Sequence, residues 1–263
     1  MNVKALCTTN DPCDTLSWHD AIRKDGFEIK VLPAFRPDKA MAVNNLKTYN
    51  DYLDNLEKVS DSSIRDYNSL ISALRRRHDF FHGRGCRLSD HGLTTVPSAV
   101  FTAREVNTAF KKARAGKKID ASESDKLRLS ILLDVARMNA ERNWTMQLHL
   151  GVMRNNNTRM FRELGPDTGF DSIGDYEIAR PLAAFMDVLD QKKNLPRTII
   201  YSVNPRDNDL LATMIGNFQD GNIPGKIQLG SGWWFLDQKQ GMEAQMNSLS
   251  NMGLLSRFVG MLT

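Results

Sequence analysis

Short β-prone runs recur along the whole chain, and each is followed by a polar stretch and then by sequence typical of a helix. In chain order the runs are residues 3–9, 28–35, 86–92, 145–151, 197–204, 225–232 and 257–263. The segments between them have the length of crossover connections, which parallel strands require and hairpins do not. Seven such runs predict an α/β fold built from parallel βα units.

Two of the intervening segments carry clear helix signals. Residues 60–85 begin with Ser and Asp side chains that cap helices, place apolar residues on one face and close with Arg residues and a Gly. A second long helix is predicted from about Ser122 to Arg142. No linker rich in Pro, Gly or Ser divides the chain, so we expect one domain over 1–263 with a helical insertion around 92–142.

The unusual residues of the chain gather at the C-terminal edges of the β-prone runs. These polar, rigid or aromatic edges are residues 8–12, 35–39, 89–92, 149–157, 202–208 and 230–234. In a (β/α)8 barrel all strand ends converge on one face, whereas an open sheet uses only those near its switch point. The pattern favours an incomplete TIM-type barrel over an open sheet, with one strand fewer than eight.

Composition and charge limit the function classes. A chain of 263 residues with 41% hydrophobic residues can bury a large core, and nothing in it reads as collagenous, coiled or disordered. The 35 basic and 31 acidic residues leave a formal charge of only +4. An RNA-binding module is supported only by the basic stretches 75–87 and 111–118, whose charges we expect on solvated helix ends and loops.

Cysteine usage and hydropathy indicate the compartment. Cys7, Cys13 and Cys86 form no CxxC pair and leave one thiol over in any disulfide scheme, which favours a reducing cytoplasm. The N-terminus has no signal-peptide pattern, and no run approaches the ~18 apolar residues of a membrane span. We therefore expect a cytoplasmic protein with neither a membrane nor a nucleic acid as partner.

Three candidate site residues follow the second and third β-prone runs. Arg36 precedes Pro37, which limits local flexibility and suits a guanidinium held ready for a carboxylate. A surface Arg that only caps a loop has the same spacing. Asp90 and His91 are compatible with a metal ligand, an acid–base pair or a buried polar network.

Further candidates follow the fourth and sixth runs. His149 shares one side of its run with Gln147, but a single His without an HxH, HExxH or CxxC motif does not make an independent metal site. The triplet Asn155–Asn157, with Arg154 and Arg159 beside it, suits recognition of sugar hydroxyls and a carboxylate, and equally suits satisfaction of loop backbone groups. The adjacent Trp233 and Trp234 must point in different directions, so that one can pack in the core while the other faces a ligand.

Taken together, long blocks of the chain closely resemble the uronate isomerases, which are bacterial aldose–ketose isomerases of the amidohydrolase superfamily. The blocks are residues 1–19, 29–40, 85–93, 147–175, 204–219, 225–235 and 252–263. The resemblance implies an intramolecular oxidoreductase of hexuronate catabolism. It interconverts D-glucuronate with D-fructuronate, and D-galacturonate with D-tagaturonate.

The resemblance also implies roles for several residues. The family's substrate-binding arginine falls on Arg36, and its active-site tryptophan falls within Trp233 and Trp234. His149 matches a strand position that ligates metal in many relatives, and the block with Asp90 matches the barrel mouth. A divalent metal, Zn²⁺ or Mn²⁺, is implied as cofactor, and homo-oligomer formation is left open.

The family pattern further implies that the chain is an internal segment of a longer family member. It would carry strands two to eight, and it would lack the final helix and the first strand, which bears a His-x-His motif. On this hypothesis the chain alone shows no isomerase activity. The alternative function is that of an inactive structural or sugar-acid-binding fragment.

Overall fold

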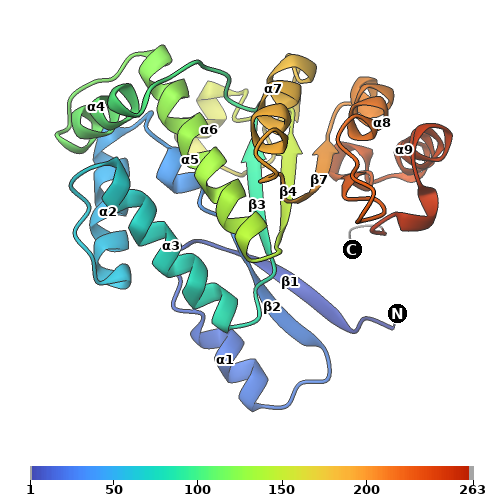
Figure 1. The fold of residues 1–263 in the computed structure, drawn as a ribbon, viewed down its shortest axis with the longest axis horizontal. Coiled ribbons are helices and arrows are strands. Elements are labelled where there is room, and N and C mark those ends of the chain that lie inside the picture. Colours follow the sequence, from blue (N-terminus) through green and yellow to red (C-terminus); the bar gives the residue numbers. More distant parts are fainter. Residues whose placement is uncertain (1, 261–263) are drawn as a thin grey trace. The chain divides into compact units, whose positions relative to one another are not determined.

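The computed structural model describes residues 2–260. The chain divides into two compact units, which are described separately here. Unit 1 comprises Met1–His91 and Pro97–Met146, and unit 2 comprises Gly92–Val96 and Gln147–Thr263. Figure 1 labels most of the helices and strands that build them.

Unit 1 is built on parallel strands that neighbour each other in chain order. β1 (Ala5–Asn10) pairs with β2 (Lys30–Phe35) along its whole length, and β2 pairs with β3 (Leu88–Leu93) where Phe35 lies opposite Ser89. β4 (Thr145–Leu150) begins beside β3, because the Thr145 N–H donates to the Arg87 carbonyl at 3.0 Å. The predicted parallel βα arrangement is confirmed here.

Most helices of unit 1 begin at side-chain caps that the sequence contains, whereas the helix that starts at Ser17 follows Leu16 and has no side-chain cap. Asp66 and Ser69 form a capping box at the start of α3, and Asp120 and Glu123 form another at the start of α5. α5 matches the predicted second long helix to within one residue at each end. The helices are α1 (Ser17–Lys24), α2 (Leu46–Ser60), α3 (Tyr67–Gly83), α4 (Ala103–Arg114) and α5 (Ala121–Glu141), with a 3₁₀ turn η1 at Asp38–Met41.

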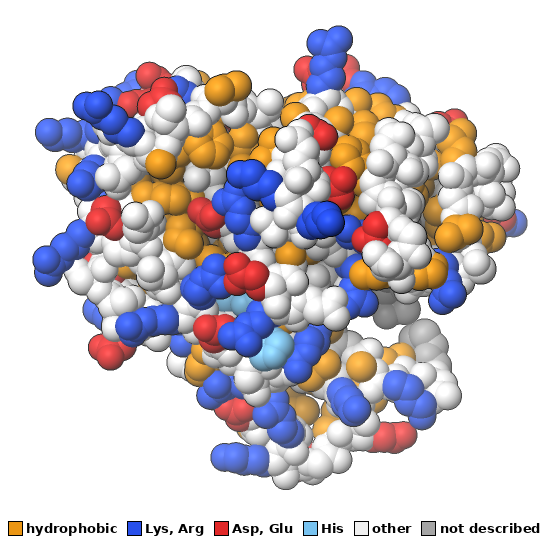
Figure 2. Space-filling view, in the orientation of Figure 1, with side chains coloured by type: hydrophobic (Ala, Val, Ile, Leu, Met, Phe, Trp, Pro, Cys, Tyr) orange, Lys and Arg blue, Asp and Glu red, His pale blue; other side chains and the backbone are white. Residues whose placement is uncertain are grey.

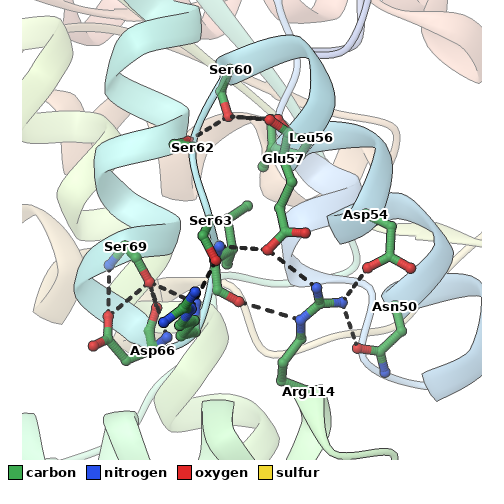
Figure 3. Close-up of polar contacts among 12 residues, drawn as sticks. Asn50, Asp54, Leu56, Glu57, Ser60, Ser62, Ser63, Asp66, Ser69 and Arg114 are labelled. Atoms are coloured by element: carbon green, nitrogen blue, oxygen red, sulfur yellow. Dashed lines mark hydrogen bonds and ion pairs between the residues drawn. The ribbon is translucent and has the colours of Figure 1, made fainter.

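One arginine ties two of these helices to each other and to the segment that precedes a third. Arg114, at the end of α4, lies 2.7 Å from the Asp54 carboxylate and 3.3 Å from the Glu57 carboxylate of α2 (Figure 3). Its Nε donates to the Ile64 carbonyl in the segment that leads into α3. Because the side chain is only 23% exposed, these contacts fix the helices more firmly than surface ion pairs do.

Unit 2 continues the parallel pattern and adds a small antiparallel pair. The Val203 N–H, just after β7 (Arg197–Ser202), donates to the Leu150 carbonyl at the end of β4, and β7 pairs in parallel with β8 (Ile227–Leu229). β5 (Val152–Met153) and β6 (Ser172–Ile173) pair antiparallel. The remaining elements are α6 (Thr158–Leu164), α7 (Ala179–Asp190), α8 (Asn208–Gly216) and α9 (Lys239–Met252), with 3₁₀ turns η2 (Pro205–Asp207), η3 (Trp234–Leu236) and η4 (Leu255–Arg257).

The predicted strand over 257–263 is wrong in its described part. Arg257 closes η4, and residues 258–260 belong to no strand, while 261–263 lie outside the described residues. β-prone side chains favour a paired, half-buried surface and do not create the partner strand. Within residues 2–260 the parallel sheet therefore contains six strands rather than seven.

Several cations of the basic stretches singled out in the sequence pair with acidic side chains in unit 1. Arg75 pairs with Glu141, Lys112 pairs with Glu123, and Arg114 pairs with Asp54. On the face shown in Figure 2, Lys and Arg side chains lie among Asp and Glu side chains. Separately, no helix among the described residues is long and apolar enough to cross a membrane.

Candidate functional site

A charged cluster lies at the C-terminal ends of β2 and β3 in unit 1. It consists of Arg36, Asp38, Asp90 and His91. The Arg36 N–H donates to the Asn10 carbonyl at 2.8 Å, so the β1–β2 ladder holds its backbone one residue beyond the end of β2. The Arg36 Nε donates to Asp38 Oδ2 at 3.0 Å, and its Nη1 lies 3.5 Å from Asp90 Oδ2.

Strand β3 places Asp90 and His91 in buried positions. Asp90 is 5% exposed and accepts a hydrogen bond from the Thr9 hydroxyl at 3.3 Å. His91 is fully buried, with Nδ1 3.3 Å from Asp38 Oδ1 and Nε2 2.9 Å from the Ser89 hydroxyl. Of the three interpretations that the sequence left open, these contacts show a buried polar network that reaches Arg36.

Asp38 is the member of the cluster that the sequence analysis missed. It is the first residue of η1 and contacts both Arg36 and His91. The signal that would have found it is local, because Pro37 turns the chain directly after Arg36 and brings the next carboxylate back to it. Two acidic side chains therefore flank the single guanidinium of the cluster.

A second buried layer supports the charged cluster inside unit 1. The Asn139 amide of α5 donates to the Ser89 hydroxyl at 2.7 Å, and its oxygen lies 3.2 Å from His78 Nε2 on α3. The His78 ring stacks on Trp144 with centroids 3.7 Å apart. Burial lowers the pKa of His78 to about 4, against the opposing effect of the Asn139 hydrogen bond, so His78 is neutral at pH 7.

An aromatic cluster occupies the C-terminal ends of β4, β7 and β8 in unit 2. It consists of His149, Tyr201, Trp233 and Trp234. The rings of His149 and Tyr201 stack with centroids 4.4 Å apart and an interplanar angle of 4°. The Trp233 ring meets His149 at 4.5 Å in an edge-on arrangement and meets Trp234 at 5.8 Å. Tyr201, which the sequence analysis did not identify, packs its ring face to face against the His149 ring.

Glycine makes this stacking sterically feasible. A Cβ at Gly230 would lie 2.3 Å from Tyr201 Cε1, closer than real Cβ atoms approach, so only Gly allows the ring to lie against the end of β8. Tyr201 itself is 2% exposed, so it has little room to move away.

The two tryptophans point in different directions, as predicted from their adjacency. Trp233 lines a cavity of about 70 Å³, and His149 and Arg154 share its wall. Trp234 is 38% exposed and lies under the Arg154 guanidinium, whose carbon is 4.7 Å from the ring centroid. The expectation that one of the two packs in the core is wrong, because Trp233 is only half-buried beside the cavity and Trp234, which starts the η3 turn with φ 52°, is exposed.

The Asn-rich loop beside Arg154 mainly satisfies its own backbone. The Asn156 amide donates to the Met153 carbonyl at 3.0 Å, and Asn157 caps α6 by accepting from the Met160 N–H. Arg154 lies 3.1 Å from the Asp171 carboxylate. Of the two hypotheses for this loop, backbone satisfaction is the one that the described contacts support.

The described residues do not form a metal centre by themselves. Among residues 2–260, no three His, Cys, Asp or Glu side chains come close enough together to hold a metal ion. His149 offers a single imidazole, and aromatic rings cover it from two directions. A zinc site takes three or four protein ligands, and these residues supply one imidazole. No step of the reaction is therefore attributed to a metal held by the described residues.

Comparison with known proteins assigns the chain to a family. A family model described as glucuronate isomerase matches residues 1–263. The chain belongs to the glucuronate isomerase family. Relatives of this family include the uronate isomerases of Bacteroides fragilis (strain YCH46) and Cellvibrio japonicus, each 52% identical over essentially the whole chain.

Solved structures of the family agree with the fold. A uronate isomerase from Thermotoga maritima matches 99% of the chain with a TM-score of 0.91 at 29% identity, and a glucuronate isomerase from Caulobacter crescentus matches 98% with a TM-score of 0.87 at 25% identity. The expected TIM-like α/β fold with a mostly parallel sheet is thereby confirmed. The chain covers 56% of the length of both curated relatives, and 56% and 52% of the two solved chains.

Proposed function

We propose that the function of the chain is that of a hexuronate isomerase. Such an enzyme interconverts D-glucuronate with D-fructuronate and D-galacturonate with D-tagaturonate. The observation that carries this proposal is the match of the glucuronate isomerase family to the entire chain, residues 1–263. The reaction moves the carbonyl from C1 to C2 after ring opening. A proton leaves C2, an enediol forms, and a proton returns to C1.

Arg36 is our candidate for substrate binding in unit 1. Two carboxylates counterbalance its charge at 3.0 and 3.5 Å, so the cluster combines cationic donors with anionic acceptors. Such a mixture suits a sugar acid, which presents a carboxylate and several hydroxyl groups. In unit 2, Trp233 and Trp234 are our candidates for an apolar wall against the substrate.

The remaining attributes are proposed from the family. A divalent cation, Zn²⁺ or Mn²⁺, is the proposed cofactor, to which the described residues contribute His149. A hexuronate is the proposed small-molecule partner, with neither a nucleic acid nor a membrane as a further one, and the cytoplasm is the proposed location. The base that takes the C2 proton is not assigned to any described residue.

The test measures binding and turnover separately. The chain is titrated with D-glucuronate by calorimetry, and ketose formation is followed by ¹³C NMR with added Zn²⁺ or Mn²⁺. A second candidate, a sugar-acid-binding segment without turnover, is favoured by the 56% coverage of the relatives. It predicts binding without ketose. If the chain shows no binding and no turnover, both proposed functions are wrong.

A matched pair of variants tests the role of Arg36. Arg36→Met removes a guanidinium from the charged cluster, whereas Arg180→Met removes one that is 93% exposed. Because a charged hydrogen bond contributes about 1.5–3 kcal/mol, we expect Arg36→Met to weaken glucuronate binding by roughly 10- to 150-fold. Arg180→Met should bind like the parent chain. Equal affinities for the two variants would remove Arg36 from the site.

A further inference from the structure

A continuous line of buried polar contacts leads from α3 to the charged cluster of unit 1. It runs through His78, Asn139, Ser89 and His91, all 1% exposed or less. The steps are 3.2 Å from His78 Nε2 to Asn139 Oδ1, 2.7 Å from Asn139 Nδ2 to Ser89 Oγ, and 2.9 Å from Ser89 Oγ to His91 Nε2. The line ends where His91 Nδ1 lies 3.3 Å from Asp38 Oδ1.

The donors and acceptors along this line have one consistent direction. An amide nitrogen only donates, so Ser89 accepts from Asn139 and its own proton is left to donate to His91 Nε2. A neutral imidazole that accepts at Nε2 carries its proton on Nδ1. That proton then lies on the side of the Asp38 carboxylate, in a charge–dipole contact of 3.3 Å between Nδ1 and Oδ1 rather than an aligned hydrogen bond.

The reverse direction is electrostatically unfavourable. With the Asn139 amide turned over, Ser89 would donate to Asn139 and accept from an Nε2–H of His91. The lone pair of His91 Nδ1 would then face the Asp38 carboxylate at 3.3 Å in a buried site. With the Asn139 amide donating to Ser89, a doubly protonated ring would require Ser89 to accept from both neighbours, and its buried proton would find no acceptor along the line.

We propose that His91 is a positioning residue for Arg36: the buried line fixes its Nδ1–H tautomer, this proton orients Asp38, and Asp38 holds the Arg36 Nε. The link to substrate rests on the proposed function, because it takes Arg36 as the substrate-binding group. The tautomer and the orientation of Arg36 do not rest on it. They are properties of unit 1 alone.

The first experiment reads the tautomer directly. The chain is labelled with ¹⁵N-histidine, and long-range ¹H–¹⁵N spectra distinguish protonated from unprotonated ring nitrogens, with His91→Asn used to assign the signals. We expect a protonated Nδ1 and an unprotonated Nε2 for His91. An Nε2–H tautomer or a doubly protonated ring in the parent chain would overturn the proposal without any variant.

A pair of serine variants tests the contact between Ser89 and His91. Ser89→Ala removes the donor to Nε2, so we expect the ¹⁵N resonance of His91 Nε2 to shift while Nδ1 stays protonated toward Asp38. Ser60→Ala removes another buried hydroxyl of unit 1, which donates to the Leu56 carbonyl, and should leave His91 unchanged. An unaltered His91 spectrum in Ser89→Ala would show that the line does not control the ring.

The last pair separates positioning from general structural support. In His91→Asn the amide nitrogen can occupy the place of Nδ1, whereas in His91→Gln it can occupy the place of Nε2. We expect His91→Asn to keep the Arg36 Nε–H resonance and to bind glucuronate within about threefold of the parent, and His91→Gln to lose about tenfold. Equal losses would reduce His91 to a structural residue. If the parent binds no glucuronate, the proposed function fails, while the tautomer and the Nε–H resonance still decide this inference.

Discussion

The charged cluster of unit 1 and the aromatic cluster of unit 2 both follow the C-terminal ends of parallel strands, yet different forces hold them. Arg36 is fixed by contacts between named polar atoms, at 3.0 Å to Asp38 and 3.5 Å to Asp90. His149 is fixed by ring faces, at 4.4 Å to Tyr201 and 4.5 Å to Trp233. Polar contacts impose direction, whereas ring contacts impose mainly shape and available space.

The two clusters also differ in what lies behind them. Trp144 is fully buried beneath the polar layer of unit 1, where it stacks on His78 and donates its indole N–H to His82 at 2.9 Å. Trp234 is 38% exposed in unit 2 and is covered by the Arg154 side chain, which is itself 41% exposed. Substitutions in unit 1 should therefore affect folding more strongly than equivalent substitutions in unit 2.

The largest effect is expected for the buried tryptophan. Trp144→Ala leaves a cavity beneath His78 and should lower the free energy of unfolding by about 3–5 kcal/mol. Trp234→Ala should cost about 1 kcal/mol, because much of its ring already meets water. Urea unfolding followed by circular dichroism measures the free energy of unfolding of both variants, and Trp18→Ala, at a 79% exposed position, is the control. Equal losses for Trp144 and Trp234 would remove the difference between the clusters.

The next effect is a pH dependence that belongs to unit 1. The pKa of His78 is about 4 in the folded chain because the ring is buried, and about 6.5 in the unfolded chain. As the pH falls from 6.5 to 4, the unfolded chain takes up a proton that the folded chain does not, so stability decreases by up to about 3 kcal/mol.

His78→Phe keeps a ring against Trp144 and removes this titration. We expect its free energy of unfolding, measured in urea between pH 7 and pH 4.5, to fall less steeply than that of the parent chain. A variant with the parent's slope would assign the pH dependence to other groups.

A smaller effect is expected where the aromatic cluster meets glycine. Gly230→Ala places a methyl group against the buried Tyr201 ring and should cost about 1–3 kcal/mol by overpacking. It should also change the ring-current shifts of His149 in the NMR spectrum. Gly221→Ala is the matched control, since no atom lies within 4 Å of its Cβ position. If Gly230→Ala behaves like this control, the proposed role of Gly230 is wrong.

The smallest effect belongs to the outer rim of unit 2. Arg154→Gln removes the cation above Trp234 and the contact with Asp171, both at a side chain that is 41% exposed. Cation–π and surface ion pairs of this kind contribute about 0.5–1 kcal/mol. Arg159→Gln, at a 75% exposed position, is the comparison, and unfolding in low and high salt measures both. A loss above about 2 kcal/mol would mean that Arg154 supports the core of unit 2.

The sequence alone predicted the elements whose signals are local. β1 to β4, β7 and β8 lie within the β-prone runs to within a few residues, and α3 and α5 begin at acidic caps that can be read directly. The β5–β6 pair was missed, because two strands of two residues each carry no periodicity to detect. Family resemblance pointed to Arg36, His149 and the tryptophans as site residues, and those roles stay predictions.

What the sequence by itself determined is the order of βα units, the caps of the helices and the family. These depend on residues that are neighbours in the chain, where spacing and side-chain type are sufficient. Tertiary structure alone decided that Ser89 and Asn139 connect His78 to His91, and that Gly230 admits Tyr201 beneath His149. Apart from Ser89 and His91, these partners lie tens of residues apart, and only the packed fold sets the distance and direction on which their hydrogen bonds and ring contacts depend.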